Sequence, residues 1–430
     1  MEQKDKVKEI NIKGLFRTIW IANLFSIFST LNINYSLGIW TIEEYHSTMS
    51  YTLVFLFTYL PSIFLSPYTG ALVDKINVKT ANLLSIIGLL INTIILFMVF
   101  ILKNESLLII YMFVAFNSAF NTLQWSAFQK IVYLLFNDKT TNEITKANGF
   151  VQAAQSISYL LSPIFSTLVL GLVSINLIIS ITVILYIVSL ILLKNVVLHS
   201  KPIISEGKNT WSEIKEGFLF IKNNRPISLL VMYFTFNFFL LGMVNALITP
   251  LVLSFANKNS LTVVLTSSGI GMVFGSIAIS KWGGPKKRIR GVLIPTILLG
   301  VSIIMGGLRE SIWLISVSGF IAFFLIPIIR GCGTSIIQSL TPYEIFGRII
   351  SIARMLSISS LPLAYLIAGT TIDHMLVPLF KENSQLVEIV YLIIGRGEMR
   401  EIGLLFVILG IFTVMLGIIG MFSSNLKTLK

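Results

Sequence analysis

Residues 80–102 read Thr80-ANLLSIIGLLINTIILFMVFI-Leu102, a run of 23 residues without a charged side chain. A helix of roughly 20 predominantly apolar residues is long enough to cross the hydrocarbon core of a bilayer. The whole chain has this character: of its 430 residues, 55% are hydrophobic and 12% are charged, whereas soluble domains are roughly 25% charged. A water-soluble globule of this composition would expose large apolar patches. The composition therefore predicts a membrane protein and excludes most soluble enzymes and disordered proteins.

Eleven further apolar segments alternate with charged or turn-rich stretches, and each is long enough to span a bilayer as a helix. The twelve predicted spans lie at about 15–41, 50–73, 80–102, 106–129, 149–171, 175–193, 227–254, 261–280, 291–308, 311–338, 349–372 and 401–423. We therefore expect an all-α membrane protein of twelve transmembrane helices in two six-helix bundles. The bundles are predicted at 1–200 and 226–430, joined by a cytoplasmic linker at 201–225 that contains an amphipathic helix.

The basic residues are distributed unevenly between the two sides of these spans. Of the 32 lysine and arginine residues, 24 fall on the side of the termini and 6 on the other, while Arg330 and Arg354 lie inside predicted spans. An excess of Lys and Arg marks the cytoplasmic side, so we expect both termini in the cytoplasm and no cleaved signal peptide. The same distribution explains the net charge of +13, because the excess basic residues face the anionic lipids of the inner leaflet. No nucleic-acid partner is expected.

The residues that usually form metal or catalytic sites are scarce and scattered. The single cysteine, Cys332, and the three histidines form no ligand pattern with metal-site spacing. There is no Walker A sequence, and none of the 19 acidic residues lies at the centre of a predicted span. We expect no metal, no cofactor and no enzymatic activity.

The linker carries a helix signal of its own. Thr210 and Glu213 have capping-box spacing, and an apolar stripe follows at helical intervals. The stripe consists of Trp211, Ile214, Phe218 and Ile221. Such a helix either lies along the inner membrane interface or covers a loop between the bundles.

The loop after the second span reads Gly70-ALV-Asp74-Lys75-INV-Lys79. Glycine lets helix ends approach closely, and an acid at this point can accept hydrogen bonds from a helix N-terminus or an arginine. The loop resembles motif A of the major facilitator superfamily. The equivalent loop of the second half, from Gly275 to Arg288, keeps glycines and bases but has Ile279 where the acid would fall.

Four more segments resemble the drug-exporter branch of that superfamily, which includes macrolide and enterobactin efflux carriers. They are Ala147-Asn-Gly149, Glu216-GFLFIKNNR-Pro226, Gln338-SLTPYEIFG-Arg348 and Gly395-Arg-Gly397. The resemblance implies a secondary active transporter, an antiporter that exports a small or medium amphipathic compound (a drug, siderophore or peptide-like metabolite) by proton-coupled alternating access. It also implies a monomeric protein of a bacterial cell membrane, with multidrug resistance as a possible phenotype. Residues expected in the gate are Gly70, Asp74, Lys75, Lys79, Gly347 and Arg348.

Three departures from the family pattern bear on energy coupling. The glycine-rich motif of the fifth span is replaced by small hydroxyl residues around Pro163, Asn117 stands where the fourth span has an arginine, and Thr30 stands where many members have an acid. Coupling is therefore predicted to depend on an acid at an outer helix end. The candidates are Glu43, Glu44 and Asp373. In the alternative interpretation, these three acids are solvated charges in outer loops.

Polar uncharged side chains gather on one face of each of three spans, and amides within lipid must point inward. We predict a substrate cavity lined by Asn23, Ser26, Thr30, Asn34, Asn117, Asn121, Gln124, Trp125, Asn237, Asn245 and Arg330. Interhelical hydrogen bonding without substrate is the alternative for the polar residues, and snorkelling to the inner interface is the alternative for Arg330. Uptake in place of export, or a membrane sensor or enzyme on the same fold, also stays open.

Overall fold

The computed structural model describes residues 2–46, 48–136, 140–198, 209–381 and 385–423. These residues are almost entirely helical, and no strand occurs among them. Twelve helical segments in the described part of the chain are long and apolar enough to cross a membrane. The predicted twelve-span, all-α architecture is therefore confirmed.

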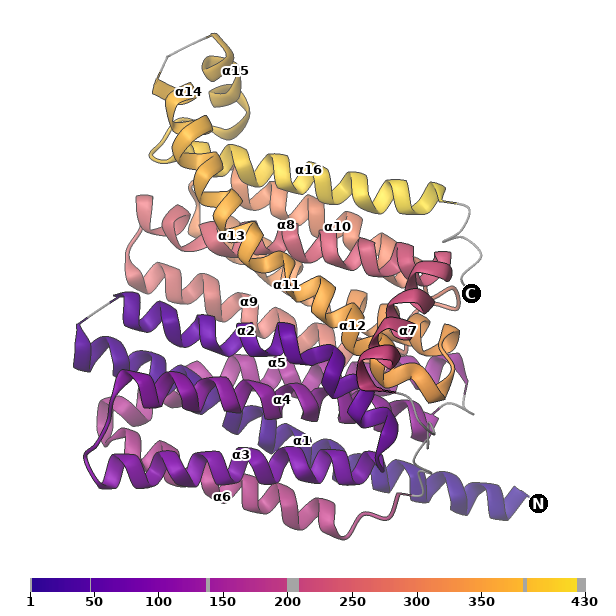
Figure 1. Ribbon diagram of the computed structural model, residues 1–430. Helices are drawn as coiled ribbons and strands as arrows, with labels where there is room; N and C mark the ends of the chain where they lie inside the picture. Colours follow the sequence, from indigo (N-terminus) through magenta and orange to yellow (C-terminus); the bar gives the residue numbers. More distant parts are fainter. Residues whose placement is uncertain (1, 47, 137–139, 199–208, 382–384, 424–430) are drawn as a thin grey trace. The chain divides into compact units, whose positions relative to one another are not determined.

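The first half forms long helices joined by short connections, and the linker helix comes after them (Figure 1). They are α1 (Glu2–Tyr45), α2 (Thr48–Lys75), α3 (Val78–Ile101), α4 (Leu107–Phe136), α5 (Thr141–Leu172), α6 (Ile175–Lys194) and the linker helix α7 (Thr210–Asn223). The loop predicted between the spans at 106–129 and 149–171 needs correction, because α4 continues to Phe136 and α5 begins at Thr141. Lys130, expected in this loop, therefore lies inside a membrane helix.

The second half contains four long helices and then a more broken segment. The long helices are α8 (Arg225–Phe255), α9 (Lys258–Trp282), α10 (Arg290–Leu308) and α11 (Ile312–Leu340). The eleventh span is built from a 3-10 turn (Tyr343–Ile345), α12 (Phe346–Ile358), α13 (Ser360–Thr371), a π-helical turn (Ile372–Leu376) and α14 (Val377–Lys381). The short helix α15 (Gln385–Ile394) and the last span, α16 (Arg400–Phe422), follow.

The chain forms two compact units, and each combines segments from both halves of the sequence. Unit 1 consists of Met1–Thr140, Ala154–Lys222 and Gln338–Met355, and unit 2 consists of Thr141–Ala153, Asn223–Ile337 and Leu356–Lys430. The beginning of α5 thus packs in unit 2, and the beginning of α12 packs in unit 1. The division into bundles at 200 and 226 stays a prediction.

In unit 1, α1 packs on α6, α2 packs on α4, and α3 packs on both α4 and α6 (Figure 1). Hydroxyl groups hold α5 against α1: Ser166 donates to the Asn32 Oδ1 at 2.6 Å and accepts from Ser36 at 2.9 Å. The small side chains around Pro163 therefore permit the close helix approach that the glycines of the family motif would provide. On the outside of α3, apolar residues such as Ile95 and Met98 are exposed, as expected of a lipid-facing surface.

In unit 2, α10 packs on α16, and α8 packs on α13 and α16. The buried side chain of Arg400 closes the C-terminal end of α10, because its Nη2 donates to the carbonyls of Gly307 at 2.9 Å and Leu308 at 3.0 Å. The last carbonyls of a helix have no partner within the helix, and a cation at this end also meets the negative end of the helix dipole. Arg400 is therefore a structural residue.

The linker helix α7 is present where the sequence predicts it, but its beginning differs. The predicted capping box is wrong: Asn209, one residue before Thr210, accepts the hydrogen bond from the Trp211 backbone N–H at 3.5 Å. Glu213 is instead fully buried and pairs with Lys75 at 2.9 Å, while Thr210 Oγ1 accepts from the same lysine at 3.3 Å. The linker helix is thus attached to unit 1 through the end of α2.

Candidate functional site

The end of α2 carries a buried carboxylate, Asp74, whose side chain is surrounded by donors. Its Oδ1 accepts from the Lys130 Nζ at 2.5 Å and from the Gly347 backbone N–H at 2.9 Å. Its Oδ2 accepts from the backbone N–H of Arg348 at 3.0 Å and from Nε of the same residue at 3.3 Å. We call Asp74, Lys130, Gly347 and Arg348 the Asp74 cluster. All four residues belong to unit 1.

The geometry of the Asp74 cluster follows from the start of α12 at Phe346. The first N–H groups of a helix lack intrahelical partners, and the positive end of the helix dipole attracts an anion. Asp74 satisfies two of these donors and so links the end of α2 to a helix more than 270 residues later. Three of the residues expected in the gate, Asp74, Gly347 and Arg348, are thus in direct contact.

The basic members of the cluster have further partners. The Lys130 ammonium lies 4.8 Å from the centre of the Tyr343 ring, and Arg348 Nη1 donates to Glu216 at 3.2 Å. Arg348 thereby connects α12 to the linker helix. Of the other predicted gate residues, Lys75 pairs with Glu213, and Lys79 Nζ donates to the Lys194 carbonyl at 2.9 Å.

The equivalent loop of the second half is held without an acid. Arg288 is buried and its Nη1 donates to the Ser335 carbonyl at 2.7 Å, while Asn148 Nδ2 donates to the Ser335 Oγ at 3.0 Å. Burial lowers the pKa of Arg288 to about 10, so this arginine stays protonated at neutral pH. The loop begins at Gly283, whose φ of +82° is a left-handed conformation that glycine adopts without strain.

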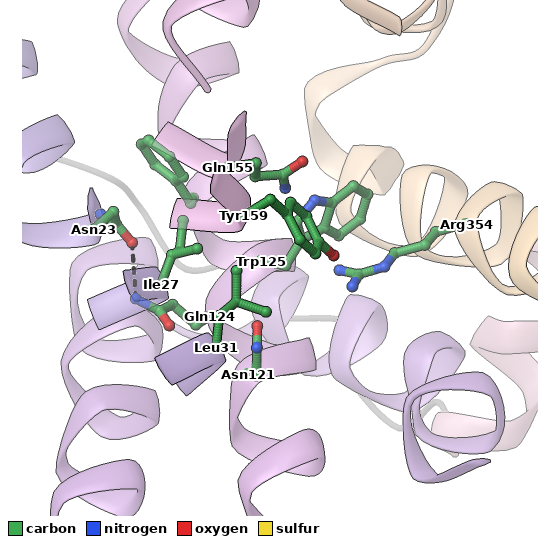
Figure 2. A pocket seen from close by; sticks show the side chains of 10 residues that line it. Asn23, Ile27, Leu31, Asn121, Gln124, Trp125, Gln155, Tyr159 and Arg354 are labelled. Atoms are coloured by element: carbon green, nitrogen blue, oxygen red, sulfur yellow. Dashed lines mark hydrogen bonds between the residues drawn. The ribbon is translucent and has the colours of Figure 1, made fainter. Parts of the chain in front are cut away.

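Unit 1 also contains a cavity of about 60 Å³, which we call the Arg354 pocket (Figure 2). It lies among α1, α4, α5 and α12 and combines amides, aromatic rings, aliphatic side chains and one cation. Its lining residues are Asn23, Ile27, Leu31, Asn121, Gln124, Trp125, Phe128, Gln155, Tyr159 and Arg354. The predicted cavity residues Asn23, Asn121, Gln124 and Trp125 are thus brought together.

Hydrogen bonds between α1 and α4 fix the amides at one side of the Arg354 pocket. Gln124 Nε2 donates to the Asn23 Oδ1 at 3.1 Å (Figure 2), and the Gln124 Oε1 accepts from Ser26 at 3.1 Å. Ser26 is therefore buried behind the lining residues and orients one of them. This bond is interhelical, as the alternative interpretation of the polar faces proposed.

The other predicted cavity residues of unit 1 do not line this pocket. Thr30 bonds the Tyr186 hydroxyl at 2.9 Å, which joins α1 to α6, and Asn34 and Asn117 are buried. The three predicted residues of unit 2 have different surroundings: Asn237 is buried, Asn245 is exposed, and the Arg330 guanidinium lies 4.6 Å from the centre of the Phe238 ring. A role of these residues in substrate binding stays a prediction.

Two of the coupling candidates lie at a helix end, and the third, Asp373, lies inside the eleventh span, which continues to Lys381. Glu43 and Glu44 are exposed near the end of α1, and Asp373 is exposed in the π-helical turn after α13. Single π-helical turns are frequently found at functional sites. Whether any of the three carries a coupling proton stays a prediction.

Sequence reasoning missed Lys130 in the gate, and Gln155, Tyr159 and Arg354 in the pocket. A charged side chain at the centre of a membrane helix costs about 2.5–3.5 kcal/mol on insertion scales, so it is by default a functional candidate. Arg354, inside the eleventh span, had this signal. Lys130 lacked it, because the predicted span ended one residue before it.

The sequence profile of the Major Facilitator Superfamily matches residues 19–364. The chain therefore belongs to the Major Facilitator Superfamily, and it is a multi-pass membrane transporter, not an enzyme. It is 23% identical over 381 residues to a macrolide efflux protein A from Streptococcus pyogenes, a match that covers 85% of this chain and 91% of that protein. It is 24% identical over 319 residues to a macrolide efflux protein A from Enterococcus faecalis, with coverage of 72% and 96%. The resemblance to the drug-exporter branch is confirmed.

Among solved structures, the fold is similar to that of a bacterial homologue of the iron transporter ferroportin in an outward-facing state. The TM-score is 0.70 at 10% sequence identity, and the superposition covers 94% of this chain and 98% of that one. At this identity the likeness concerns the fold alone.

Proposed function

We propose that the protein is a secondary active exporter of a small or medium amphipathic compound, such as a drug, siderophore or peptide-like metabolite, and that it exchanges this compound for protons. The Asp74 cluster is the observation that carries the proposal. It ties two helices of the first half to the beginning of α12 by four hydrogen bonds to a single buried carboxylate. In an alternating-access cycle these bonds break and reform, because the gate must open once in each cycle.

The relatives support the direction of transport. The two similar bacterial proteins carry the name macrolide efflux protein, and a shared branch favours a shared direction. The Arg354 pocket supports an amphipathic solute, because it offers amide groups and aromatic rings at the same place. We propose that the gate of the Asp74 cluster is on the cytoplasmic side and that both termini lie there.

Export and its coupling are tested together in cells that lack other exporters. Cells with the protein are loaded with a panel of a macrolide, a siderophore and a hydrophobic peptide, and efflux is measured with and without an imposed pH gradient. We expect gradient-dependent efflux of at least one compound and its loss in one of Glu43→Gln, Glu44→Gln or Asp373→Asn, because the acid that exchanges the proton is removed. Glu398→Gln, another exposed acid, is the matched control.

Two results would contradict parts of this proposal. Accumulation in place of efflux would establish an uptake carrier. Wild-type efflux in all three variants under the imposed gradient would exclude the outer acids and favour another ion or facilitated diffusion.

The orientation is tested with reporter fusions. Fusions at Gly207 and Lys286 are expected to report cytoplasm, and fusions at His46 and Gln385 the outside, because most of the 32 basic residues fall in segments predicted on the first side. An outside signal at Gly207 would overturn the six-plus-six arrangement.

A further inference from the structure

The linker helix α7 has a buried side and an exposed side of unusual composition. The buried side consists of Glu213, Ile214, Gly217 and Ile221. A helix turns by about 100° per residue, and on this count five exposed residues fall within an arc of about 100° on another side. They are Trp211, Lys215, Phe218, Leu219 and Lys222. We call these five residues the outer face of α7.

The rest of α7 is held by other helices of unit 1. The Glu213 carboxylate pairs with Lys75 of α2 at 2.9 Å, and Arg348 of α12 donates to Glu216 at 3.2 Å. A Cβ added at Gly217 would lie 2.8 Å from the Ile352 Cδ1, so α12 packs closely on this side. These contacts leave the outer face exposed.

The outer face combines large apolar side chains with lysines. Trp211 is 63% exposed and Leu219 is 46% exposed, and Lys215 and Lys222 are exposed beside them. Lysine is depleted at protein–protein interfaces, whereas a helix with Trp, Phe or Leu and flanking Lys residues is typical of a membrane surface. The composition therefore favours lipid over a protein partner.

The outer face is continuous with the lipid-facing surface of α2. Phe64, Tyr68 and Leu72 are exposed at intervals of four residues along α2, within the span Leu53–Lys75, and an exposed apolar strip on a membrane helix is covered by lipid. The ring centres of Tyr68 and Trp211 lie 6.4 Å apart. Tyr68 comes two turns before the end of α2 at Lys75, so Trp211 lies beside the last turns of the span. Trp and Tyr are enriched at this depth, where the lipid headgroups begin.

The charge of the outer face determines which lipid it suits. Lys215 and Lys222 are two helical turns apart, about 10 Å, and both lie within the arc of Trp211 and Leu219. Basic side chains next to a membrane span are attracted to anionic headgroups. A zwitterionic headgroup carries no net charge and lacks this attraction.

We propose that the outer face of α7 lies on the inner leaflet of the membrane and binds anionic phospholipid. Trp211, Phe218 and Leu219 contact the upper part of the acyl chains, and Lys215 and Lys222 contact headgroup phosphates. The inference goes beyond the proposed function because it assigns a lipid partner, and it rests on the proposed orientation only for the choice of leaflet.

The test measures contact of α7 with two lipids in nanodiscs of phosphatidylcholine. The full-length purified protein carries Cys332→Ala and a bimane label on Leu219→Cys. Its fluorescence is quenched with phosphatidylglycerol or with phosphatidylcholine, each brominated near the headgroup and added at the same mole fractions. We expect the association constant of the phosphatidylglycerol to be roughly fivefold higher, because both lysines attract its charge. At high salt the ratio should fall toward one, because exposed charges are screened.

Controls assign this preference to the outer face. The same label on Ile95→Cys, on the lipid-facing surface of α3, should be quenched equally by the two lipids. Lys215→Gln with Lys222→Gln should reduce the fivefold preference to about one and retain quenching by phosphatidylcholine. The matched charge control is Lys103→Gln with Lys258→Gln, which removes two other exposed lysines and should retain the preference.

Three results would overturn the proposal. Absence of quenching by either lipid at Leu219→Cys would show that α7 does not lie on the membrane. Equal quenching by the two lipids would exclude an anionic site, and an unchanged preference without Lys215 and Lys222 would exclude these lysines. A nanodisc exposes both faces of the membrane and the assay involves no transport. Failure of the export or orientation proposals would therefore leave these results unchanged.

Discussion

Asp74→Asn is expected to lower the free energy of unfolding by about 3–5 kcal/mol, because it removes one partner of a buried ion pair. The ammonium of Lys130, which is 1% exposed, would lose the carboxylate oxygen 2.5 Å away. An asparagine offers one acceptor oxygen where the carboxylate offers two, and its NH₂ group would face other donors. Arg348 and the first N–H groups of α12 would lose acceptors as well.

A second substitution separates this charge effect from lost packing. Lys130→Met removes the stranded cation, so Asp74→Asn with Lys130→Met should be more stable than Asp74→Asn alone. Lys130→Met by itself should have a smaller effect, since Asp74 keeps Arg348. Denaturant titration of the purified proteins measures all four members of the cycle. Strictly additive effects, or a loss below about 1 kcal/mol in Asp74→Asn, would show that the pair is not energetically coupled.

Asp74→Asn is also expected to open the gate. The hydroxyls of Ser126 and Ser351 lie 2.9 Å apart, and both residues are fully buried. In a protein lacking Cys332, a cysteine at Ser126 should react with a permeant maleimide faster after Asp74→Asn than before, because α12 is less firmly held. Unchanged reactivity would argue against Asp74 as the gate.

Gly70→Ala is expected to abolish the contact between α2 and α12 at the gate, because the added Cβ would clash with α12. A Cβ at Gly70 would lie 2.5 Å from the Gly347 carbonyl oxygen and 2.7 Å from the Ser351 Cβ. The carbonyl belongs to the backbone and cannot rotate away, so α2 and α12 must move apart. Overpacking of this kind costs about 1–3 kcal/mol and occasionally more, and we expect transport to fall at least tenfold, about 1.4 kcal/mol in rate terms.

A glycine in an open environment provides the control for this variant. Gly171 lies near the end of α5, and an added Cβ there would meet no atom within 4 Å. Gly171→Ala should retain wild-type transport and wild-type reactivity of the cysteine at Ser126. Normal transport in Gly70→Ala, measured in the same efflux assay in cells, would show that the close contact of α2 and α12 is dispensable.

Part of the candidate site could be predicted because short-range sequence patterns report it. Asp74 follows Gly70 at the end of a span, and helix-end chemistry predicts that such an acid meets N–H donors. Gly347 and Arg348 are predicted from the family resemblance. Asn23, Asn121 and Gln124 could be predicted as inward-facing because lipid excludes unpaired amides. A helical face, however, does not specify its neighbour. Asn23 and Ser26 both bond Gln124 of α4, whereas Thr30, on the same face, bonds Tyr186 of α6.

The sequence by itself determined that the protein lies in a lipid bilayer and how many times the chain crosses it, because bilayer thickness sets the length of every apolar run. It also determined the family, since the motifs fall at particular loops in order. Only the tertiary structure decided that Lys130 is a buried partner of Asp74 and that Arg354 enters a pocket with Trp125. These contacts join residues separated by 56 positions or more, and they depend on how whole helices pack. Hydropathy and spacing describe one helix at a time, whereas the partner of a buried charge is decided by the neighbouring helices.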